Sequence, residues 1–301
     1  MVRGKLFDDE FLQRLARLGL IAKRISASSH GGGQRRTRRL GDGLEFADHR
    51  AYTPGDDMRL LDWPCYARME RMLLRLFHEH SEGIVTIFLD CSGSMSLGAE
   101  GGRVGKFDYA RRTAAALAYV AMSGLDRVQI IPFSDELGDG MQTGRNRRQI
   151  LQVLEYLETL NAEGRTSLGA SVEQYARRYK EAGTVIILTD LLDADDDLAG
   201  ALSALRQRTS EVILLQIVDR YDAAPSLLGP MQLGSVETGR RMNLNINETV
   251  LASYAERWGE FIRSAEKSCL EKGAIYLQAP TSSPFERLVL QVLEKAGVLQ
   301  I

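Results

Sequence analysis

The stretch that decides the fold is "VTIFLDCSGSMSLG", from Val85 to Gly98. Apolar and β-branched residues, typical of a buried strand, run into Asp90, and the chain then becomes small and polar. The simplest interpretation is a turn in which serine and glycine close a strand-to-helix loop. A carboxylate that ends an apolar strand, however, needs a partner or an ion, because burying an unpaired charge is costly. Asp90 therefore favours metal binding over a simple turn.

Around this stretch, from Gly83 onward, apolar runs alternate with amphipathic segments. The runs predict strands at Ile84–Leu89, Val128–Phe133, Thr184–Thr189, Val212–Val218 and Ala274–Gln278. The segments between them predict helices at Phe107–Ser123, Arg147–Thr159, Leu168–Glu181, Asp197–Arg208 and Asn247–Lys272. Nearly continuous apolar strands are typical of a sheet covered on both faces by helices. We expect an α/β fold over residues 83–301, with a doubly wound, mainly parallel sheet that binds ligands at the carboxyl ends of its strands.

Residues 1–82 are predicted to form an N-terminal extension packed on this domain. It would consist of an amphipathic helix over Asp8–Ile25, a connector rich in glycine, serine and arginine, and an irregular block over Gly41–Ala67. The aromatic residues of the block would pack on the neighbouring domain, and Arg71–Glu79 would be a strand entering it. Within the main domain, Met231–Ile246 predicts a hairpin insertion with its turn at Glu237–Gly239.

Composition limits the classes of function. The chain has 301 residues, 44% of them hydrophobic, and a net charge of −2, so it does not have the basic character of a nucleic-acid binder. The arginine-rich residues 34–39 are expected to be a solvated surface segment. The 3 cysteines form no CxxC pair, which fits a reducing compartment. Acidic residues occupy the start, and no run of about 18 apolar residues occurs, so we expect a cytoplasmic protein without membrane insertion.

Oxygen-bearing side chains follow separate predicted strands. Asp90, Ser92 and Ser94 come after the first strand, Thr166 precedes a helix in "GRTSLGAS", and Asp190 ends the strand in "VIILTDLLD". Hard divalent cations such as Mg²⁺ take oxygen ligands of this kind. One coordination position could stay open for an acidic group from outside. Taken singly, Thr166 could instead cap the following helix, and Asp190 could cap a loop.

At these residues the chain resembles the von Willebrand factor type A domain. That domain carries a metal ion-dependent adhesion site (MIDAS) written Asp-x-Ser-x-Ser, then a distant Thr, then a distant Asp, and the order agrees here. The resemblance implies that Ser92, Ser94 and Thr166 bind the ion directly, and that Asp90 and Asp190 act directly or through water. The implied ion is Mg²⁺, or Mn²⁺ or Ca²⁺ in its place.

The block ahead of the domain carries a second resemblance. The residues that match are Glu45, Phe46, Arg50, Tyr52, Gly55, Asp56, Asp57, Arg59, Asp62, Trp63 and Arg68. They resemble the hallmark pattern of the bacterial family catalogued as domain of unknown function fifty-eight, which pairs this block with a von Willebrand A-like domain. The resemblance implies a partner, an AAA+ ATPase of the MoxR type, and a role in chaperone-like maturation or stress response. Many members carry membrane helices, which this chain lacks.

The charged residues of the block admit two interpretations. Arg50, Asp56, Asp57, Arg59 and Asp62 could form an internal ion-pair network that docks the block on the main domain. Alternatively, they could face a partner together with Glu45 and Trp63. Opposite charges so close in sequence favour the first interpretation.

The function that these features favour is a non-enzymatic, metal-dependent protein-interaction module that binds a partner carboxylate. The alternative is a metal-dependent hydrolase, such as a phosphoesterase, that uses the same ion as a Lewis acid. Haloacid-dehalogenase-like phosphatases need a second Asp two residues after the first, where this chain has Ser92. "GGRVGKF" resembles a phosphate loop only in part, because Glu100 and Phe107 replace its first Gly and its Ser or Thr, so ATP hydrolysis is not expected.

Overall fold

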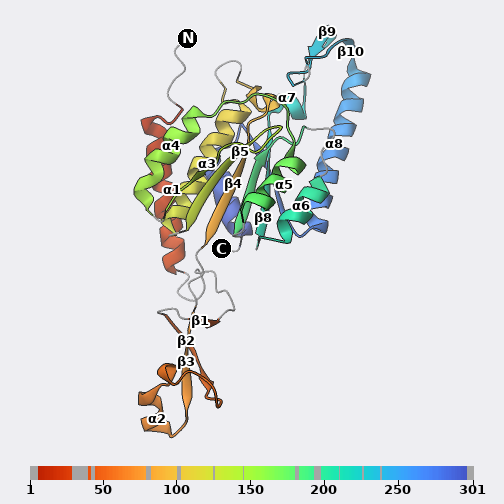
Figure 1. Ribbon diagram of the computed structural model, residues 1–301. Helices are drawn as coiled ribbons and strands as arrows, with labels where there is room; N and C mark the ends of the chain where they lie inside the picture. Colours follow the sequence, from red (N-terminus) through yellow and green to blue (C-terminus); the bar gives the residue numbers. More distant parts are fainter. Residues whose placement is uncertain are drawn as a thin grey trace. The chain divides into compact units, whose positions relative to one another are not determined.

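The computed structural model (Figure 1) divides into two compact units, which we describe separately. One unit combines Met1–Ser28 with Gly83–Ile301, and the other is Ser29–Glu82. The structure describes residues 6–28, 40–41, 45–78, 83–99, 103–124, 126–144, 146–179, 183–192, 198–209, 211–225, 227–237 and 239–296. The predicted surface segment at residues 34–39 lies outside these ranges.

The main unit is built on a six-stranded sheet. Its strands are β4 (Ile84–Asp90), β5 (Arg127–Phe133), β6 (Met141–Gln142), β7 (Thr184–Thr189), β8 (Glu211–Val218) and β11 (Ile275–Pro280). Their order across the sheet is β11-β8-β7-β4-β5-β6, in which only β6 pairs antiparallel. Of these six strands, β4 comes first in the chain, and it lies beside β7. The connections between strands therefore run outward from this pair in both directions, as in doubly wound folds.

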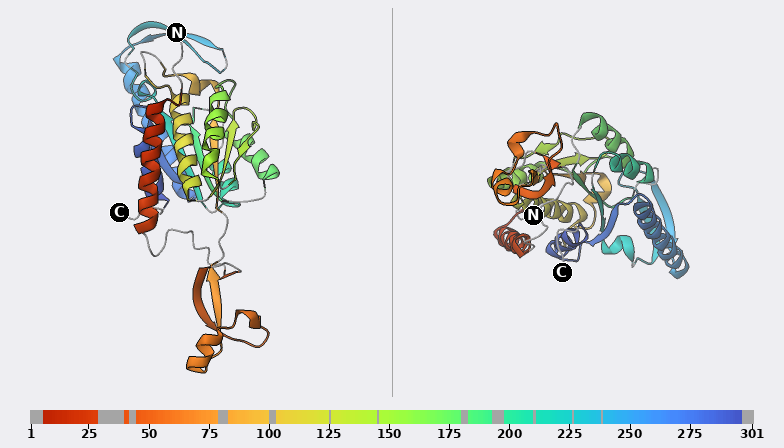
Figure 2. Two further views of the ribbon diagram at one scale, coloured as in Figure 1. Left: turned by 90° about the vertical axis from the view of Figure 1, so that its left-hand side faces the viewer. Right: turned by 90° about the horizontal axis from the view of Figure 1, so that it is seen from below.

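Helices cover both faces of this sheet, as predicted. One face is covered by α3 (Lys106–Ser123), α4 (Ile150–Thr159) and α9 (Phe285–Lys295), with α1 (Asp9–Ser28) packed on α3, and the other by α5 (Leu168–Arg178), α6 (Leu198–Arg206) and α8 (Glu248–Glu271). Successive residues of β4 point to opposite faces, so Ile87 joins the first core and Phe88 the second. Figure 2 shows α1 and α3 side by side on the first face. The predicted α/β class is therefore confirmed.

The first helix belongs to the main unit. Phe11, Leu15 and Leu18 recur at helical spacing and are buried in the same core as α3. The predicted division kept residues 1–82 together, whereas the structure separates α1 from the block that follows it. Burial of the apolar stripe of α1 against the sheet-covering helices is the physical reason for this difference.

A β-hairpin and a short helix follow β8. The helix α7 (Arg220–Ala223) leads to β9 (Gly229–Gly234), which pairs antiparallel with β10 (Arg241–Ile246). The hairpin was predicted at this place, with its turn around Glu237. Figure 1 shows that it leads into the long helix α8. Among the helices that the structure describes, none combines the length and the apolar character needed to cross a membrane.

The unit Ser29–Glu82 has a small antiparallel sheet of its own. Its strands are β1 (Leu40–Gly41), β2 (Glu45–Ala51) and β3 (Leu73–His78), in the order β1-β3-β2, with η1 (Met58–Leu60) and α2 (Trp63–Met69) between β2 and β3. The prediction that Arg71–Glu79 is a strand entering the main domain is wrong, because β3 pairs with β1 and β2. Trp63 and Tyr66 form an edge-to-face pair and are 55% and 39% exposed.

Candidate functional site

The candidate site lies at the carboxyl ends of β4 and β7. These neighbouring parallel strands form the point of the sheet at which the connections diverge, where open α/β sheets bind ligands. Asp90 is the last residue of β4, and Asp190 directly follows β7. Both carboxylates are buried, with 0% and 1% of their surface exposed. The sheet therefore brings two predicted site residues to one edge.

Asp90 is held by its own loop and by the adjacent strand. Its Oδ1 accepts a hydrogen bond from the backbone N–H of Ser92 at 2.9 Å, and its Oδ2 accepts one from Thr189 Oγ1 at 2.5 Å. Burial, together with the nearby charge of Asp190, raises the pKa of Asp90 to about 7. The hydrogen bonds from Thr189 and Ser92 oppose this shift without cancelling it. Asp90 is therefore a buried carboxyl group under the influence of a second carboxylate.

Ser92 is the N-cap of a short 3-10 turn, η2 (Gly93–Ser96), and Ser94 lies within it. Ser92 Oγ and Ser94 Oγ are 3.0 Å apart, and both residues are buried. Gly93 N–H donates to the carbonyl of Gly164 at 2.9 Å, which ties this turn to the loop that carries Thr166. The loops after β4 and before α5 are thus joined through their backbones.

Thr166 does not cap the helix that follows it. The N-cap of α5 is Ser167, which makes no side-chain capping hydrogen bond. Thr166 is buried, and its Oγ1 lies 3.5 Å from Oε1 of Glu237 in the turn between β9 and β10. The capping role that the sequence left open for Thr166 is therefore absent.

Asp190 is paired with a lysine that sequence reasoning missed. Lys106 Nζ, fully buried at the start of α3, lies 2.8 Å from Asp190 Oδ2 and 3.2 Å from Asp222 Oδ2. Burial lowers the pKa of the Lys106 ammonium, but the charges of Asp190 and Asp222 outweigh it and leave the pKa raised. The other oxygen of Asp190 accepts the backbone N–H of Leu192 at 3.1 Å. Both oxygens of Asp190 are thus held, one by Lys106 and the other by its own loop.

The donor chemistry of this cluster fits a hard divalent cation. The predicted residues contribute carboxylate and hydroxyl oxygens, which such ions prefer. Lys106 pairs with Asp190 and Asp222, and the charge of Asp190 acts on Asp90, so when all are ionised these four side chains carry two more negative charges than positive ones. No group of three His, Cys, Asp or Glu residues suited to a metal occurs in the described part of the chain. Hydroxyl groups would have to supply the remaining ligands.

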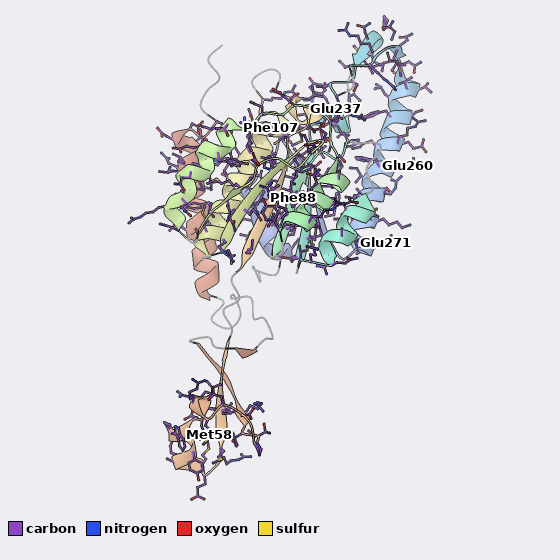
Figure 3. All side chains as sticks on the ribbon, viewed as in Figure 1. Met58, Phe88, Phe107, Glu237, Glu260 and Glu271 are labelled. Carbon is purple, nitrogen blue, oxygen red and sulfur yellow. The ribbon has the colours of Figure 1, made fainter. Side chains whose placement is uncertain are left out.

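The turn between β9 and β10 lies against the serine turn. A Cβ atom added to Gly93 would lie 3.4 Å from Val236 Cγ1 and 3.7 Å from Glu237 Cγ, so the two turns are in contact. Figure 3 shows Glu237 at the end of the main unit from which the hairpin projects. Sequence reasoning placed Glu237 in a hairpin turn but did not assign it to the site.

The charged residues of the hallmark block pair within their own unit. Arg50 lies 2.7 Å from Asp56, and Arg59 lies 2.7 Å from Asp57. Asp62 contacts His49 at 2.8 Å. The hydrogen bond from Thr53, together with Arg50, lowers the pKa of Asp56 to about 2. The predicted ion pairs therefore exist within the block, and their role in docking it on the main domain stays a prediction. The side chain of Glu45 lies outside the described residues.

One comparison with known proteins shows the family, and another finds uncharacterized relatives. A family model described as "Protein of unknown function DUF58" matches residues 48–260. Uncharacterized proteins from Mycobacterium tuberculosis and Mycobacterium bovis are each 24% identical over 259 residues, which is 85% of this chain and 80% of theirs.

Solved structures with some likeness include proteins of Bacteroides. An aerotolerance-related membrane protein from Bacteroides fragilis matches with a TM-score of 0.42 at 18% identity, covering 71% of this chain and 99% of that one. The conserved hypothetical protein BatB from Bacteroides thetaiotaomicron gives a TM-score of 0.41 at 16% identity, covering 71% and 98%. A von Willebrand factor type A protein from Catenulispora acidiphila gives 0.36 at 18% identity, covering 64% and 44%.

Proposed function

The chain belongs to the DUF58 family of proteins of unknown function, and on this premise we propose that it is a metal-dependent protein-interaction module. In this proposal Ser92, Ser94 and Thr166 bind a divalent cation through their hydroxyl oxygens, and Asp90 and Asp190 bind it directly or through water. The cation is Mg²⁺, or Mn²⁺ or Ca²⁺ in its place. When bound, it supplies the positive charge that attracts a carboxylate from a partner protein.

The observation that carries the proposal is the position of Asp90. This carboxyl group is buried near Asp190, and no cation in the described residues forms an ion pair with it. Folding has placed two carboxylates next to each other and out of solvent, although like charges at short range repel. Lys106 compensates Asp190 and Asp222, whereas Asp90 accepts hydrogen bonds from Ser92 and Thr189 and forms no ion pair within the described part of the chain. A divalent cation beside Asp90 would compensate this charge, and in this proposal the hydroxyls of Ser92 and Ser94 bind it.

We propose protein interaction rather than hydrolysis as the function of this site. Asp90 is followed two residues later by Ser92, whose hydroxyl contacts Ser94 Oγ, and not by the second aspartate that would act as an acid. Lys106, the cation nearest to the carboxylates in the described residues, is fully buried between Asp190 and Asp222. It therefore serves the internal charge balance. A phosphoesterase activity is the outcome that would reverse this choice.

The partner that we propose is an AAA+ ATPase of the MoxR type. We choose this partner because of the family resemblance, which also implies a role in chaperone-like maturation or stress response. The acidic residue that reaches the site would belong to this ATPase or to a protein that the two handle together. The exposed Trp63 and the ion-paired charges of the hallmark block are candidates for a second contact with the same partner.

The experiment compares three proteins: wild type, Asp90→Asn and the control Asp139→Asn, whose side chain is fully exposed. Mg²⁺ is titrated calorimetrically into each, capture of a co-expressed MoxR-type ATPase is measured with Mg²⁺ and with EDTA, and generic phosphate esters are tested as substrates. We expect Asp90→Asn alone to lose both metal binding and capture, with no turnover in any sample. Ester hydrolysis that disappears with Asp90→Asn would contradict the proposal.

A further inference from the structure

The hairpin β9–β10 is an exposed arm whose turn reaches the candidate metal site. Of the residues in its two strands, only Ile246 is buried. An arm that buries so little apolar surface contributes little to the stability of the main unit. Its contact with the site therefore needs another explanation than core packing.

The turn is ordered so that Glu237 faces the site. Ser235 N–H donates to the carbonyl of Arg240 at 2.8 Å, and Gly239 N–H donates to the carbonyl of Ser235 at 3.0 Å. Gly239 has a φ of +66°, in the left-handed region that glycine adopts without strain. These bonds close the turn, and its Glu237 Oε1 lies 3.5 Å from Thr166 Oγ1.

The same turn also covers the serine loop. Val236 and Glu237 would both contact a Cβ atom added to Gly93, the residue between Ser92 and Ser94. The carboxylate of Glu237 thus lies next to one proposed hydroxyl ligand, while its side-chain stem lies against the loop that carries two others. Each of these hydroxyl groups comes from a loop far from Glu237 in sequence.

We propose that Glu237 supplies to this site, from within the chain, the carboxylate that the site otherwise takes from a partner. The inference rests on the proposed function, because it assumes a cation held by Ser92, Ser94 and Thr166. Glu237 then acts as a tethered competitor, and a partner binds by displacing the turn of the hairpin. The ligand class of the site is a glutamate or aspartate side chain presented on a turn.

Tethering makes this competition effective. A group held by a short linker acts as if it were present at about millimolar concentration. A free acidic side chain of weak intrinsic affinity therefore does not displace Glu237. A partner that makes additional contacts can displace Glu237. Only specific partners therefore occupy the site. The arm can open without exposing the core, because Ile246 is its only buried residue among those described in its strands.

The test measures Mn²⁺ affinity in wild type, Glu237→Gln, Glu237→Asp and the control Glu260→Gln, which alters an exposed glutamate of α8 (Figure 3). Glu237→Asp keeps the charge but shortens the side chain, so it separates ligation from general electrostatic attraction. We expect the dissociation constant for Mn²⁺ to rise about 10-fold in Glu237→Gln and in Glu237→Asp, and to stay within twofold of wild type in Glu260→Gln. Acetate at tens of millimolar should restore the affinity of Glu237→Gln and leave wild type unchanged.

A second readout follows the arm itself. Hydrogen exchange of residues 229–246 should slow on addition of Mn²⁺ in wild type and remain unchanged in Glu237→Gln. Mn²⁺ affinity in Glu237→Gln equal to that of Glu260→Gln would overturn the inference while leaving the metal site intact. Absence of Mn²⁺ binding in wild type, or binding unaffected by Asp90→Asn, would overturn the proposed function together with this inference.

Discussion

Lys106 Nζ lies 2.8 Å from Asp190 Oδ2, and the two side chains are 0% and 1% exposed. A buried ammonium at the start of α3 thus binds the aspartate that ends the neighbouring strand β7. The pair connects α3 to the sheet and neutralises the charge of Asp190. Among the described carboxylates of the site, Asp90 is then the one whose negative charge is least compensated by a cation. The charge balance of the site is therefore set by the lysine of the phosphate-loop-like stretch "GGRVGKF", which sequence analysis did not assign to the site.

Replacing Lys106 by methionine should destabilise the fold strongly. The substitution keeps most of the side-chain volume but leaves Asp190 and Asp222 buried without their cation, which costs about 3–5 kcal/mol. Urea unfolding of Lys106→Met against wild type measures the difference. The control is Lys267→Met, which removes an exposed i,i+4 pair and should change the free energy of unfolding by less than about 1 kcal/mol. Equal losses in the two variants would contradict this assignment.

The stability of the metal-free protein should fall as pH rises. Asp90 has an ordinary pKa of 3.8, and burial beside Asp190 raises it to about 7 in the folded chain. Between these values the folded state keeps a proton that the unfolded state has lost, so the free energy of unfolding decreases with pH in this window and levels off above about 7. Urea unfolding in EDTA across pH 5–8 measures the slope. Asp90→Asn should remove this contribution, and an unchanged slope in that variant would assign it to another group.

Removing one serine hydroxyl should affect metal binding more than stability. Ser92→Ala and Ser94→Ala each lose one side of the 3.0 Å contact between these residues, which costs about 1 kcal/mol of folding stability. Because each also loses a proposed ligand, the dissociation constant for Mn²⁺ should rise about 10-fold. Calorimetry checks both variants against Ser203→Ala, whose hydroxyl donates to the carbonyl of Ala199 in α6. Affinities equal to that control would exclude the serines as ligands.

Trp63→Ser should separate partner binding from metal binding. Trp63 is 55% exposed and contacts Tyr66. Both residues belong to the unit that has the separate three-stranded sheet. The substitution should weaken capture of the ATPase while leaving the Mn²⁺ dissociation constant within about twofold of wild type, since a mostly exposed side chain contributes little to folding. Pull-down and calorimetry on the same preparations give the two values. A loss of metal affinity would show that the two units act as one site.

Strands β4, β5, β7 and β8 were predictable because each is a nearly continuous apolar run that is buried in the parallel sheet. The two-residue strand β6 is too short to leave such a signal. Helix α9 was missed although Phe285, Leu288, Val289 and Val292 recur at helical spacing and are buried. These four apolar positions carry the signal of an amphipathic helix.

Only those residues of the site that occur at the ends of predicted strands could be predicted from the sequence. Asp90 and Asp190 follow apolar runs, so their meeting at one edge follows from the parallel order of β4 and β7. Lys106 directly precedes a predicted helix, where lysine is ordinarily solvated, and only tertiary packing buries it. Glu237 reaches Thr166 because of the path of the hairpin arm, which no local pattern encodes.

The most direct test of the central claim is a crystal structure of the protein grown with Mn²⁺ and measured at the manganese absorption edge. The account predicts one anomalous peak at the carboxyl ends of β4 and β7, with Ser92, Ser94 and Thr166 hydroxyl oxygens at about 2.0–2.2 Å from it. An anomalous map with no peak beside Asp90, although Mn²⁺ is present at saturating concentration, would contradict the account.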